Sequence, residues 1–168
     1  MNDDILTWAN DYFDVIGSPK SLRIKQKVSG AAIMPIDENL NFLLIKILRK
    51  DGNYHWEFPR GFAKPNEDLH DTALRELKEE TGIDGKQASI SGYVMPDSGL
   101  IDSKIPIFTV GCSFEDIDED LIHSGNEGII DYKIVSYDEL LDMLGEITDG
   151  FTLAAIVHHD WRNMRKDD

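Results

Sequence analysis

The stretch GFAKPNEDLHDTALRELKEETGI, residues 61–83, combines strong helix signals with a concentration of acidic side chains. Residues Leu69–Thr81 are dominated by Ala, Leu, Arg, Glu and Lys, which favour an α-helix, and Gly82 supplies a C-terminal stop. Ala73 and Leu77 lie about one helical turn apart, so one face of this helix is expected to pack against a sheet. The stretch therefore predicts an amphipathic helix over residues 69–81.

Three carboxylates project from the same side of the predicted helix. Glu76, Glu79 and Glu80 stand at positions i, i+3 and i+4, where like charges repel one another. Clustered carboxylate oxygens bind hard divalent cations such as Mg²⁺ or Mn²⁺, which would offset this repulsion. A solvated charged face, with Arg75 and Lys78 as local partners, is the alternative, and the spacing alone does not separate the two.

The residues just before the helix favour a binding site over a plain charged surface. The sequence FPRGF, residues 58–62, reads as a strand that stops at Pro59 and is followed by a glycine. Gly61 lets the backbone approach a ligand closely and leaves main-chain carbonyls free to bind a metal ion. A strand, a glycine and a carboxylate helix in this order are typical of a functional site.

The same residues resemble the Nudix box, the motif G-x5-E-x7-R-E-U-x-E-E-x-G-U, in which U is an aliphatic residue. Every defined position is filled, by Gly61, Glu67, Arg75, Glu76, Leu77, Glu79, Glu80, Gly82 and Ile83. The resemblance implies an α/β fold, the Nudix α/β/α sandwich with a mixed β-sheet, in a single domain over residues 1–168. It also implies an enzyme that hydrolyses the pyrophosphate of a nucleoside diphosphate linked to another moiety, X.

The resemblance assigns roles to the residues of the box. The implied ligands of Mg²⁺ or Mn²⁺ are Glu76, Glu79, Glu80, Glu67 and the main-chain carbonyl of Arg60. Arg75 would orient a glutamate, because its guanidinium suits a bidentate pair. The bound cations would neutralise the pyrophosphate, activate a water molecule and stabilise the leaving phosphate.

Two further segments resemble the ADP-ribose and ADP-sugar pyrophosphatases of this family. GYVMPDSGLIDSKIPIFTV, residues 92–110, resembles a proline-containing loop beside their substrate and places Asp97 and Ser98 as substrate contacts. NEGIIDYKIVSYDELLDMLGEITDGFTLAAI, residues 126–156, resembles their closing segment, in which Glu127 would bind or deprotonate the attacking water. The resemblance implies hydrolysis of ADP-ribose or an ADP-sugar to AMP and a sugar phosphate.

Two other functions remain open at this point. Hydrolysis of dinucleoside polyphosphates or of RNA 5′ ends is the alternative reaction, although the net charge of −15 opposes binding to RNA. A domain that senses a nucleotide without cleaving it is the non-enzymatic alternative, because fold and function can separate. The intact set of box glutamates favours the enzyme.

Two features depart from the ADP-ribose pyrophosphatase pattern. Arg60 occupies a position where those enzymes usually have a small residue, and it would reach a phosphate or exclude the usual terminal ribose. The N-terminal segment is predicted to form one helix at about residues 3–16. Its apolar residues follow helical spacing: Ile5, Trp8, Ala9, Tyr12, Phe13 and Ile16. Those enzymes often have strands there that complete a dimer, so the sequence leaves a homodimer open.

The remaining apolar segments predict strands on either side of the central helix. Strands are expected at residues 27–36, 41–50, 54–58, 87–95, 104–114 and 129–136, and helices at 137–144 and 150–164. The acidic segment 115–128 is expected to be a surface loop. Four of its carboxylates match the spacing of a calcium-binding EF-hand loop: Asp116, Asp118, Asp120 and Glu127. Leu121 stands where that loop needs glycine, so the plain acidic loop is preferred.

Several aromatic and histidine residues have open roles. Trp56 and Phe58 alternate with Glu57 on a predicted strand, so both fit the core, with base stacking as the alternative. His158 and His159 are adjacent on a helix and therefore face different directions, which favours packing or surface roles over metal binding.

Composition narrows the expected location and partners. The chain has 17 Lys and Arg residues and 32 Asp and Glu residues. This excess of negative charge opposes binding to nucleic acid and to anionic membranes, but it allows binding of a small phosphorylated ligand together with metal. The N-terminus lacks a signal-peptide pattern, and no apolar run approaches the ~20 residues of a membrane span. Cys112 is the single cysteine and is expected to be buried and inert. A cytoplasmic protein that binds a small-molecule nucleotide is expected.

Overall fold

The helices and strands of the computed structural model follow the expected order around the central helix, with additions at the N-terminus. The structure describes residues 5–18 and 21–165. Its strands are β1 (Ile5–Ala9), β2 (Phe13–Ser18), β3 (Ser21–Gln26), β4 (Gly30–Ile36), β5 (Phe42–Leu48), β6 (Tyr54–Glu57), β7 (Arg60–Phe62), β8 (Gln87–Val94), β9 (Ile101–Asp102), β10 (Ile105–Gly111) and β11 (Ile129–Val135). Its helices are α1 (Leu69–Thr81), α2 (Glu119–His123), α3 (Tyr137–Asp142) and α4 (Gly150–Met164). Short 3₁₀ turns cover Phe114–Asp116, Asn126–Gly128 and Met143–Gly145.

The main sheet is mixed and opens at one end. Its strand order is β11-β5-β4-β10-β8, with β6 paired to β5 and β7 paired to β4. β10 runs parallel to β4, and the other pairs are antiparallel. β4 pairs with β7 over residues 30–32 and with β5 at Ile36 and Phe42. The sheet therefore opens between β4 and β5, and β6 and β7 occupy the opening.

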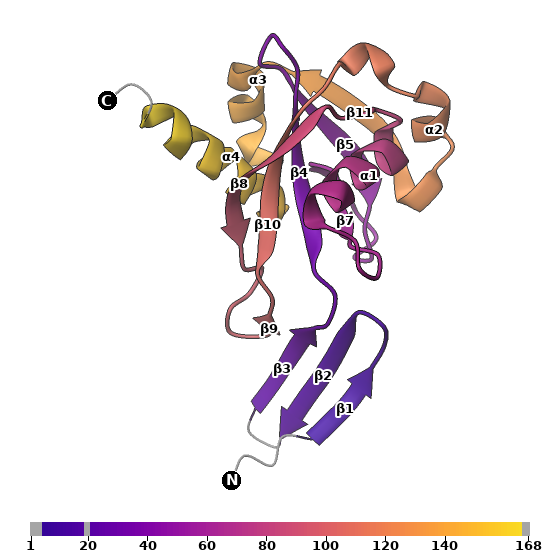
Figure 1. Ribbon diagram of the computed structural model, residues 1–168, viewed down its shortest axis with the longest axis vertical. Coiled ribbons are helices and arrows are strands. Elements are labelled where there is room, and N and C mark those ends of the chain that lie inside the picture. Colours follow the sequence, from indigo (N-terminus) through magenta and orange to yellow (C-terminus); the bar gives the residue numbers. More distant parts are fainter. Residues whose placement is uncertain (1–4, 19–20, 166–168) are drawn as a thin grey trace.

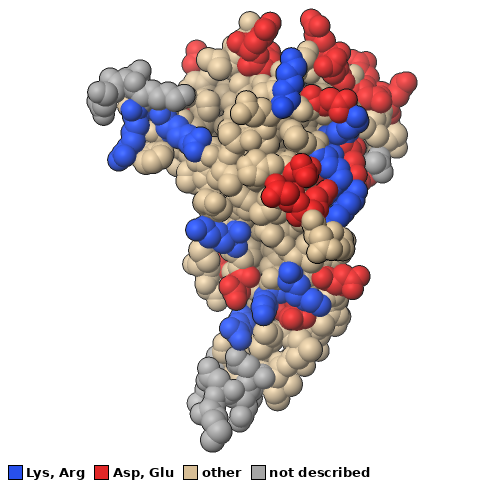
Figure 2. All heavy atoms as spheres, viewed as in Figure 1, with Lys and Arg blue, Asp and Glu red and all other residues tan. Residues whose placement is uncertain are grey.

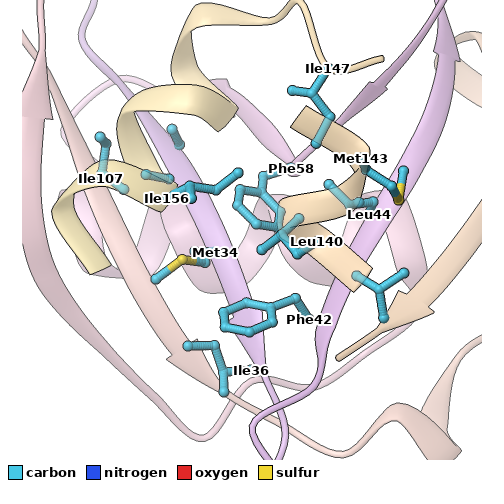
Figure 3. Close-up of a cluster of buried hydrophobic side chains, with 13 residues drawn as sticks. Met34, Ile36, Phe42, Leu44, Phe58, Ile107, Leu140, Met143, Ile147 and Ile156 are labelled. Atoms are coloured by element: carbon cyan, nitrogen blue, oxygen red, sulfur yellow. The ribbon is translucent and has the colours of Figure 1, made fainter. Parts of the chain in front are cut away.

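Helices cover both faces of this sheet, so its central strands are apolar on both sides (Figure 1). Ile33 and Leu43 face α1 and pack with Ala73 and Leu77, which confirms the predicted apolar face of that helix. The next residues along each strand point to the other face, toward α3 and α4. Figure 3 shows the larger side chains of that second cluster, among them Met34, Phe42, Leu44, Leu140 and Ile156. The predicted sandwich with a mixed sheet is confirmed.

Helix α1 has the predicted bounds, Leu69–Thr81. Asp68 caps its N-terminus by accepting a hydrogen bond from a backbone N–H of the first turn. Gly82 ends it in the left-handed conformation, with φ 80°, and its N–H donates to the Lys78 carbonyl. A Cβ on Gly82 would lie 2.5 Å from the Cβ of Asp118, so this position also lacks space for a side chain. Both ends are therefore fixed by local interactions.

The predicted N-terminal helix is wrong, because the described residues of this segment form a β-hairpin of β1 and β2. The chain reverses at Asn10, whose side-chain oxygen accepts hydrogen bonds from the N–H groups of Tyr12 (2.9 Å) and Phe13 (2.7 Å). This turn competes with helix formation, and the β-branched and aromatic residues around it favour strands. Residues 3 and 4 of the predicted helix lie outside the described residues.

Strand β3 joins the hairpin in a second sheet of order β1-β2-β3-β9, which extends away from the main body (Figure 1). The sequence did not predict β3 or β9, which pair in parallel through Ile24 and Ile101. Several large apolar residues of this sheet are more than half exposed: Ile5, Leu6, Trp8 and Leu22. An apolar surface of this kind is typical of an interface.

The acidic segment before β11 is partly helical, which corrects the prediction of a loop. Asp118 caps α2 by accepting a hydrogen bond from the Leu121 N–H at 2.9 Å. Glu119 accepts a hydrogen bond from the Tyr132 hydroxyl at 3.0 Å. These carboxylates support local structure, and the described segment does not adopt a calcium-binding EF-hand loop.

Packing accounts for the aromatic and histidine residues whose roles were open. Phe58 belongs to the buried core, and the Lys133 ammonium lies over the ring of Trp56, 4.6 Å from its centroid. His158 packs so closely on β8 that a Cβ on Gly92 would lie 2.4 Å from its ring. His159 meets the ring of a core phenylalanine edge-on. The predicted packing roles of the histidines are confirmed.

Charge is distributed unevenly over the surface. Acidic side chains gather at the end of the molecule that carries α2, whereas acidic and basic side chains lie together over α1 (Figure 2). Within the described chain, no helix has both the length and the apolar character needed to cross a membrane.

Cys112 is buried, as predicted, and we expect its thiol to be unreactive in the folded protein. Burial raises the pKa of the Cys112 thiol to about 11, so about one thiol in a thousand is ionised at pH 8. Iodoacetamide at pH 8 should modify the native protein slowly and the protein in guanidinium chloride rapidly, as measured by intact mass. Rapid modification of the native protein would contradict this burial.

Candidate active site

A cavity of about 820 Å³ lies where β7 enters the opening of the sheet. Helix α1 lines it with Glu76 and Glu80, and the turn before β11 lines it with Glu127. Arg49, which follows β5, and Arg60 at the start of β7 line it as well. The cavity thus brings together charged residues from four separate segments of the chain.

The contact between Gly61 and Glu76 explains why a glycine precedes the helix. A Cβ on Gly61 would lie 2.1 Å from the carboxylate carbon of Glu76. Gly30 of β4 is equally crowded, because its Cβ would lie 2.4 Å from the Gly61 carbonyl oxygen. Two glycines therefore allow β4, β7 and α1 to approach until the Glu76 carboxylate rests against the backbone.

Glu80 is a buried carboxylate at the base of the cavity. Its side chain is 4% exposed, and its Oε2 accepts a hydrogen bond from the Arg60 backbone N–H at 3.2 Å. Burial raises the pKa of Glu80 well above its ordinary value, and the charges of Glu76 and Glu127 raise it further. Burial also raises the pKa of Glu76, although the hydrogen bond from Arg75 opposes the shift. These carboxylates are arranged for a positively charged ligand.

The main-chain carbonyl of Arg60 faces the same side as Glu80. The carbonyl of Pro59 accepts a hydrogen bond from Ile33 of β4, so the groups of the next residue point away from β4. The Arg60 N–H accordingly reaches Glu80. In an extended strand the N–H and C=O of one residue point to the same side, so the Arg60 carbonyl lies toward Glu80 too. This orientation suits the expected metal-binding role, which stays a prediction.

Arg75 connects the glutamates of α1 to the loop before it. Its Nε donates to Glu67 at 2.7 Å, and its Nη1 donates to Glu76 at 2.7 Å and to Glu79 at 2.6 Å. Its Nη2 donates to the Phe62 carbonyl and to the second oxygen of Glu67. The same hydrogen bonds raise the pKa of Arg75, so its charge is permanent. One guanidinium therefore fixes three carboxylates and β7.

Glu67 supports Arg75 from outside the cavity lining of the described chain. Both of its oxygens accept from Arg75, and one also accepts from the Lys64 N–H and the Thr72 hydroxyl. Hydrogen bonding to Arg75 is the main reason that the pKa of Glu67 falls to about 2. The expected role of Glu67 as a metal ligand stays a prediction, whereas its contact with Arg75 is direct.

Glu79 is held by two basic side chains, Lys64 and Arg75. It pairs with Lys64 at 2.9 Å and with Arg75, and the hydrogen bond from Lys64 is the main cause that lowers its pKa. Among residues 5–18 and 21–165, no three His, Cys, Asp or Glu side chains converge on one point that would hold a metal ion. Glu79 would have to leave Lys64 to join Glu76 and Glu80 around a cation.

Glu127 lies in a turn with unusual backbone conformation. Its φ is 55°, and the flanking Gly125 and Gly128 have φ of 72° and 85°. Left-handed conformations cost free energy in a residue other than glycine, and they cluster at functional sites. Because Glu127 lines the cavity and its charge raises the pKa of both Glu76 and Glu80, the structure places it beside the α1 carboxylates.

The loop between β8 and β9 reaches the cavity through other residues than those predicted. Asp97 and Ser98 are exposed, and the Asp97 side chain accepts a hydrogen bond from the Gly99 N–H at 2.9 Å. Pro96 of this loop and Ile101, the first residue of β9, line the cavity. Substrate contacts from Asp97 and Ser98 stay a prediction.

A second wall of the cavity is made by arginines, of which the sequence analysis named Arg60 but missed Arg49. Glu57 is buried between Arg49, whose Nε donates at 3.0 Å, and Arg60, whose Nη2 donates at 3.2 Å. Arg60 also pairs with Asp149 at 3.3 Å, and its guanidinium lies 4.5 Å from the centroid of the Phe151 ring. The signal available in the sequence was Glu57, a glutamate on a predicted strand that lies close in sequence to Arg49 and Arg60.

An aromatic cluster from the N-terminal sheet was also missed. Phe62 lies 4.7 Å from Tyr12 and 5.7 Å from Phe13 between ring centroids, and all three line the cavity. These contacts depend on the hairpin, so the prediction of an N-terminal helix concealed them.

The donors of the site fit a hard divalent cation. Glu76, Glu80, Glu127 and the Arg60 carbonyl offer oxygen only, which Mg²⁺ and Mn²⁺ prefer. The described cavity lining includes neither histidine nor cysteine, the ligands that zinc and copper favour. The identity of the metal stays a prediction.

Comparisons with known proteins agree with this chemistry. The NUDIX domain model matches residues 26–154. The ADP-sugar pyrophosphatase of Mus musculus is 40% identical over 75 residues, 44% of this chain and 34% of that protein. The asymmetrical bis(5′-nucleosyl)-tetraphosphatase of Mus musculus is 43% identical over 54 residues, 32% of this chain and 35% of that protein. The matched part of the chain thus spans about a third of the length of these relatives.

A solved structure described as an ADP compounds hydrolase has a similar fold. It aligns with a TM-score of 0.71, at 17% sequence identity, and covers 98% of this chain and 94% of its own. At that identity the likeness concerns the fold. The family model, in contrast, matches well over half of the sequence, from Gln26 to Ala154, and includes the complete box of residues 61–83. The chain belongs to the Nudix family.

Proposed function

We propose that this Nudix protein is a metal-dependent pyrophosphohydrolase that cleaves ADP-ribose or an ADP-sugar to AMP and a sugar phosphate. The observation that supports the proposal is one cavity lined both by carboxylates, Glu76, Glu80 and Glu127, and by guanidinium groups, Arg49 and Arg60. Carboxylates hold the cations that bind a pyrophosphate, so the pyrophosphate would lie against the glutamate wall, and the guanidinium groups suit other anionic parts of a nucleotide. Water adds across the P–O–P bond, and each product keeps one of the two phosphates.

The helix glutamates would hold the metal ions in this reaction. Glu76, Glu79 and Glu80 are the proposed side-chain ligands, together with the Arg60 carbonyl. Bound Mg²⁺ or Mn²⁺ would neutralise the pyrophosphate and lower the pKa of the attacking water. Arg75 keeps Glu76 and Glu79 in place through hydrogen bonds of 2.6–2.7 Å.

Glu127 is the proposed general base. It lies on a turn flanked by two glycines, so its carboxylate is carried by a segment that can adjust when a substrate enters. A carboxylate near the attacking water accepts its proton as the P–O bond forms.

Hydrolysis of dinucleoside polyphosphates is the second candidate function, and the two arginines favour it because they suit a longer phosphate chain. A panel of ADP-ribose, ADP-glucose, diadenosine triphosphate and capped RNA, assayed with Mg²⁺ and Mn²⁺ by chromatography of the products, tests both. Turnover of dinucleotides alone would contradict the ADP-sugar assignment. Tight binding of ADP-ribose without turnover of any compound would support a nucleotide sensor. A cytoplasmic location stays a prediction.

Removal of metal should abolish activity, because the carboxylates of α1 offer the pyrophosphate no electrophile other than the metal ions they would hold. We expect excess EDTA to stop AMP release and added Mg²⁺ or Mn²⁺ to restore it. The cation should also raise the melting temperature, since it relieves repulsion among Glu76, Glu80 and Glu127. Full activity in excess EDTA would contradict the metal mechanism.

Substitutions should separate the metal ligands from the base. Glu79→Gln and Glu80→Gln keep the side-chain shape but remove a charge, so both should weaken Mn²⁺ binding together with turnover. Glu127→Gln should lower kcat by about 10²–10⁴-fold and leave Mn²⁺ affinity of the free protein nearly unchanged. Calorimetric Mn²⁺ titration and steady-state kinetics of the three variants measure the difference. A near-normal kcat for Glu127→Gln would contradict the assignment of Glu127 as the general base and indicate that it is an ordinary residue of a surface turn.

We also propose a homodimer that covers the N-terminal sheet. A small sheet of four strands with apolar residues on both faces gains little stability when solvated, and β1 is an edge strand of this sheet. Ile5, Leu6 and Trp8 of β1 are all exposed in one chain. A second copy of the chain would bury them, because symmetric dimers use the same patch on both subunits.

The homodimer can be tested by light scattering after size-exclusion chromatography. The wild type should have twice the chain mass of 19.0 kDa. Trp8→Glu should yield monomers, because it places a charge in the proposed interface. Trp161→Glu is the matched control, since Trp161 is similarly exposed on α4 at a distance from this sheet. A wild-type monomer, or a dimeric Trp8→Glu variant, would contradict this interface.

A further inference from the structure

Arg60 and Gly61 are neighbours on β7 and face opposite sides of the sheet, as successive strand residues do. The Gly61 side faces α1, because a Cβ there would meet Glu76. The Arg60 guanidinium instead meets Asp149 and Phe151 at the start of α4. Arg60 therefore belongs to the wall of the cavity that lies opposite the glutamates.

The charges of this wall are layered. The side chains of Arg49 and Arg60 are 33% and 28% exposed, whereas those of Glu57 and Asp149 are 2% and 8% exposed. The carboxylates thus lie behind the guanidinium groups. A solute in the cavity meets positive charge first on this wall, although the four charges sum to zero.

Arg60 is held in place yet keeps hydrogen-bonding capacity. Its Nε and Nη2 donate to Glu57 at 3.3 and 3.2 Å, and its Nη2 lies 3.3 Å from an Asp149 oxygen. Within the described chain its Nη1 has no partner. Asp149 is itself fixed, because its Oδ2 accepts from the N–H and the hydroxyl of Thr152, both at 2.8 Å. A guanidinium ordered in this way binds an anion with little further loss of side-chain entropy.

We propose that Arg60 determines specificity by binding a phosphate that belongs to X, so that the protein accepts, beside ADP-ribose or an ADP-sugar, nucleotides whose X group carries a phosphate of its own. This inference rests on the proposed function, in which the pyrophosphate lies against the glutamate wall. An anion on the opposite wall must then come from the rest of the substrate. ADP-ribose has no phosphate beyond its pyrophosphate, whereas a dinucleoside triphosphate has one. Arg60 would bind that additional phosphate through a charge-assisted hydrogen bond.

Binding of inorganic tripolyphosphate in excess EDTA tests the anion site without metal and without catalysis. Calorimetry should detect binding to the wild type, and Arg60→Gln should weaken it about tenfold or more. Arg162→Gln is the matched control, because Arg162 on α4 donates to the Ile90 carbonyl and lies outside this cavity lining. Equal affinity of the wild type and Arg60→Gln, or no binding to the wild type, would overturn the proposal.

Kinetics with Mg²⁺ test the link to specificity. Arg60→Gln should lower kcat/KM for diadenosine triphosphate about tenfold more than for ADP-ribose. An equal loss for both would assign Arg60 to the scissile pyrophosphate and overturn the proposal. If Arg60→Gln does not fold, Arg60→Lys replaces it in this test. A lysine keeps the positive charge but lacks the planar guanidinium that can bind Glu57, Asp149 and a phosphate together. An unchanged ratio of kcat/KM for diadenosine triphosphate to kcat/KM for ADP-ribose in Arg60→Lys would then overturn the proposal. If the wild type hydrolyses neither nucleotide, the proposed function fails, and calorimetry still reports on the anion site.

Discussion

The contact between the Glu76 carboxylate and the backbone of Gly61 is the constraint on which the site depends. Helix α1 approaches β7 so closely that a Cβ on Gly61 would meet the Glu76 carboxylate, which a hydrogen bond from Arg75 holds in place. β7 pairs with β4 over three residues and β6 pairs with β5, so the sheet is open beside β5, where the cavity lies. Because a strand alternates its side chains, Gly61 faces α1 and Arg60 faces α4. The position of β7 thus places Arg60 and the helix carboxylates at one cavity.

The glutamate wall is costly for the protein without a bound cation. Glu76 and Glu80 are buried, and the charge of Glu127 adds to the repulsion between them. Arg75 offsets part of this cost through its bonds to Glu76 and Glu79, but it makes no bond to Glu80 within the described chain. The unfavourable charge that is left belongs to the residues proposed to hold the metal. The instability and the affinity for cations therefore have the same physical origin.

Helix α1 was predictable to the residue because its determinants are local. The box composition, the capping Asp68 and the left-handed Gly82 all lie within or beside the helix. The N-terminal segment was not predictable in this way, because its apolar residues fit a helical period and a hairpin alike, and the turn at Asn10 decided between them. The arginine wall depends on Asp149, which is distant in sequence and meets Arg60 only through folding. Sequence patterns identify such partners poorly when no motif links them.

A chain with net charge −15 would be expected to repel a nucleotide. The exposed guanidinium groups in the cavity reduce this repulsion locally, because the carboxylates that pair with them lie behind them. Acidic side chains gather at the end of the molecule that carries α2 (Figure 2). Arg49 and Arg60 line the cavity together with the carboxylates proposed to bind metal. In the proposed function a small nucleotide would place its charge inside the cavity, where arginines and bound cations would neutralise it. A long polyanion such as RNA would extend its remaining phosphates over the acidic surface and be repelled there. The charge distribution would therefore favour short phosphate chains over long ones.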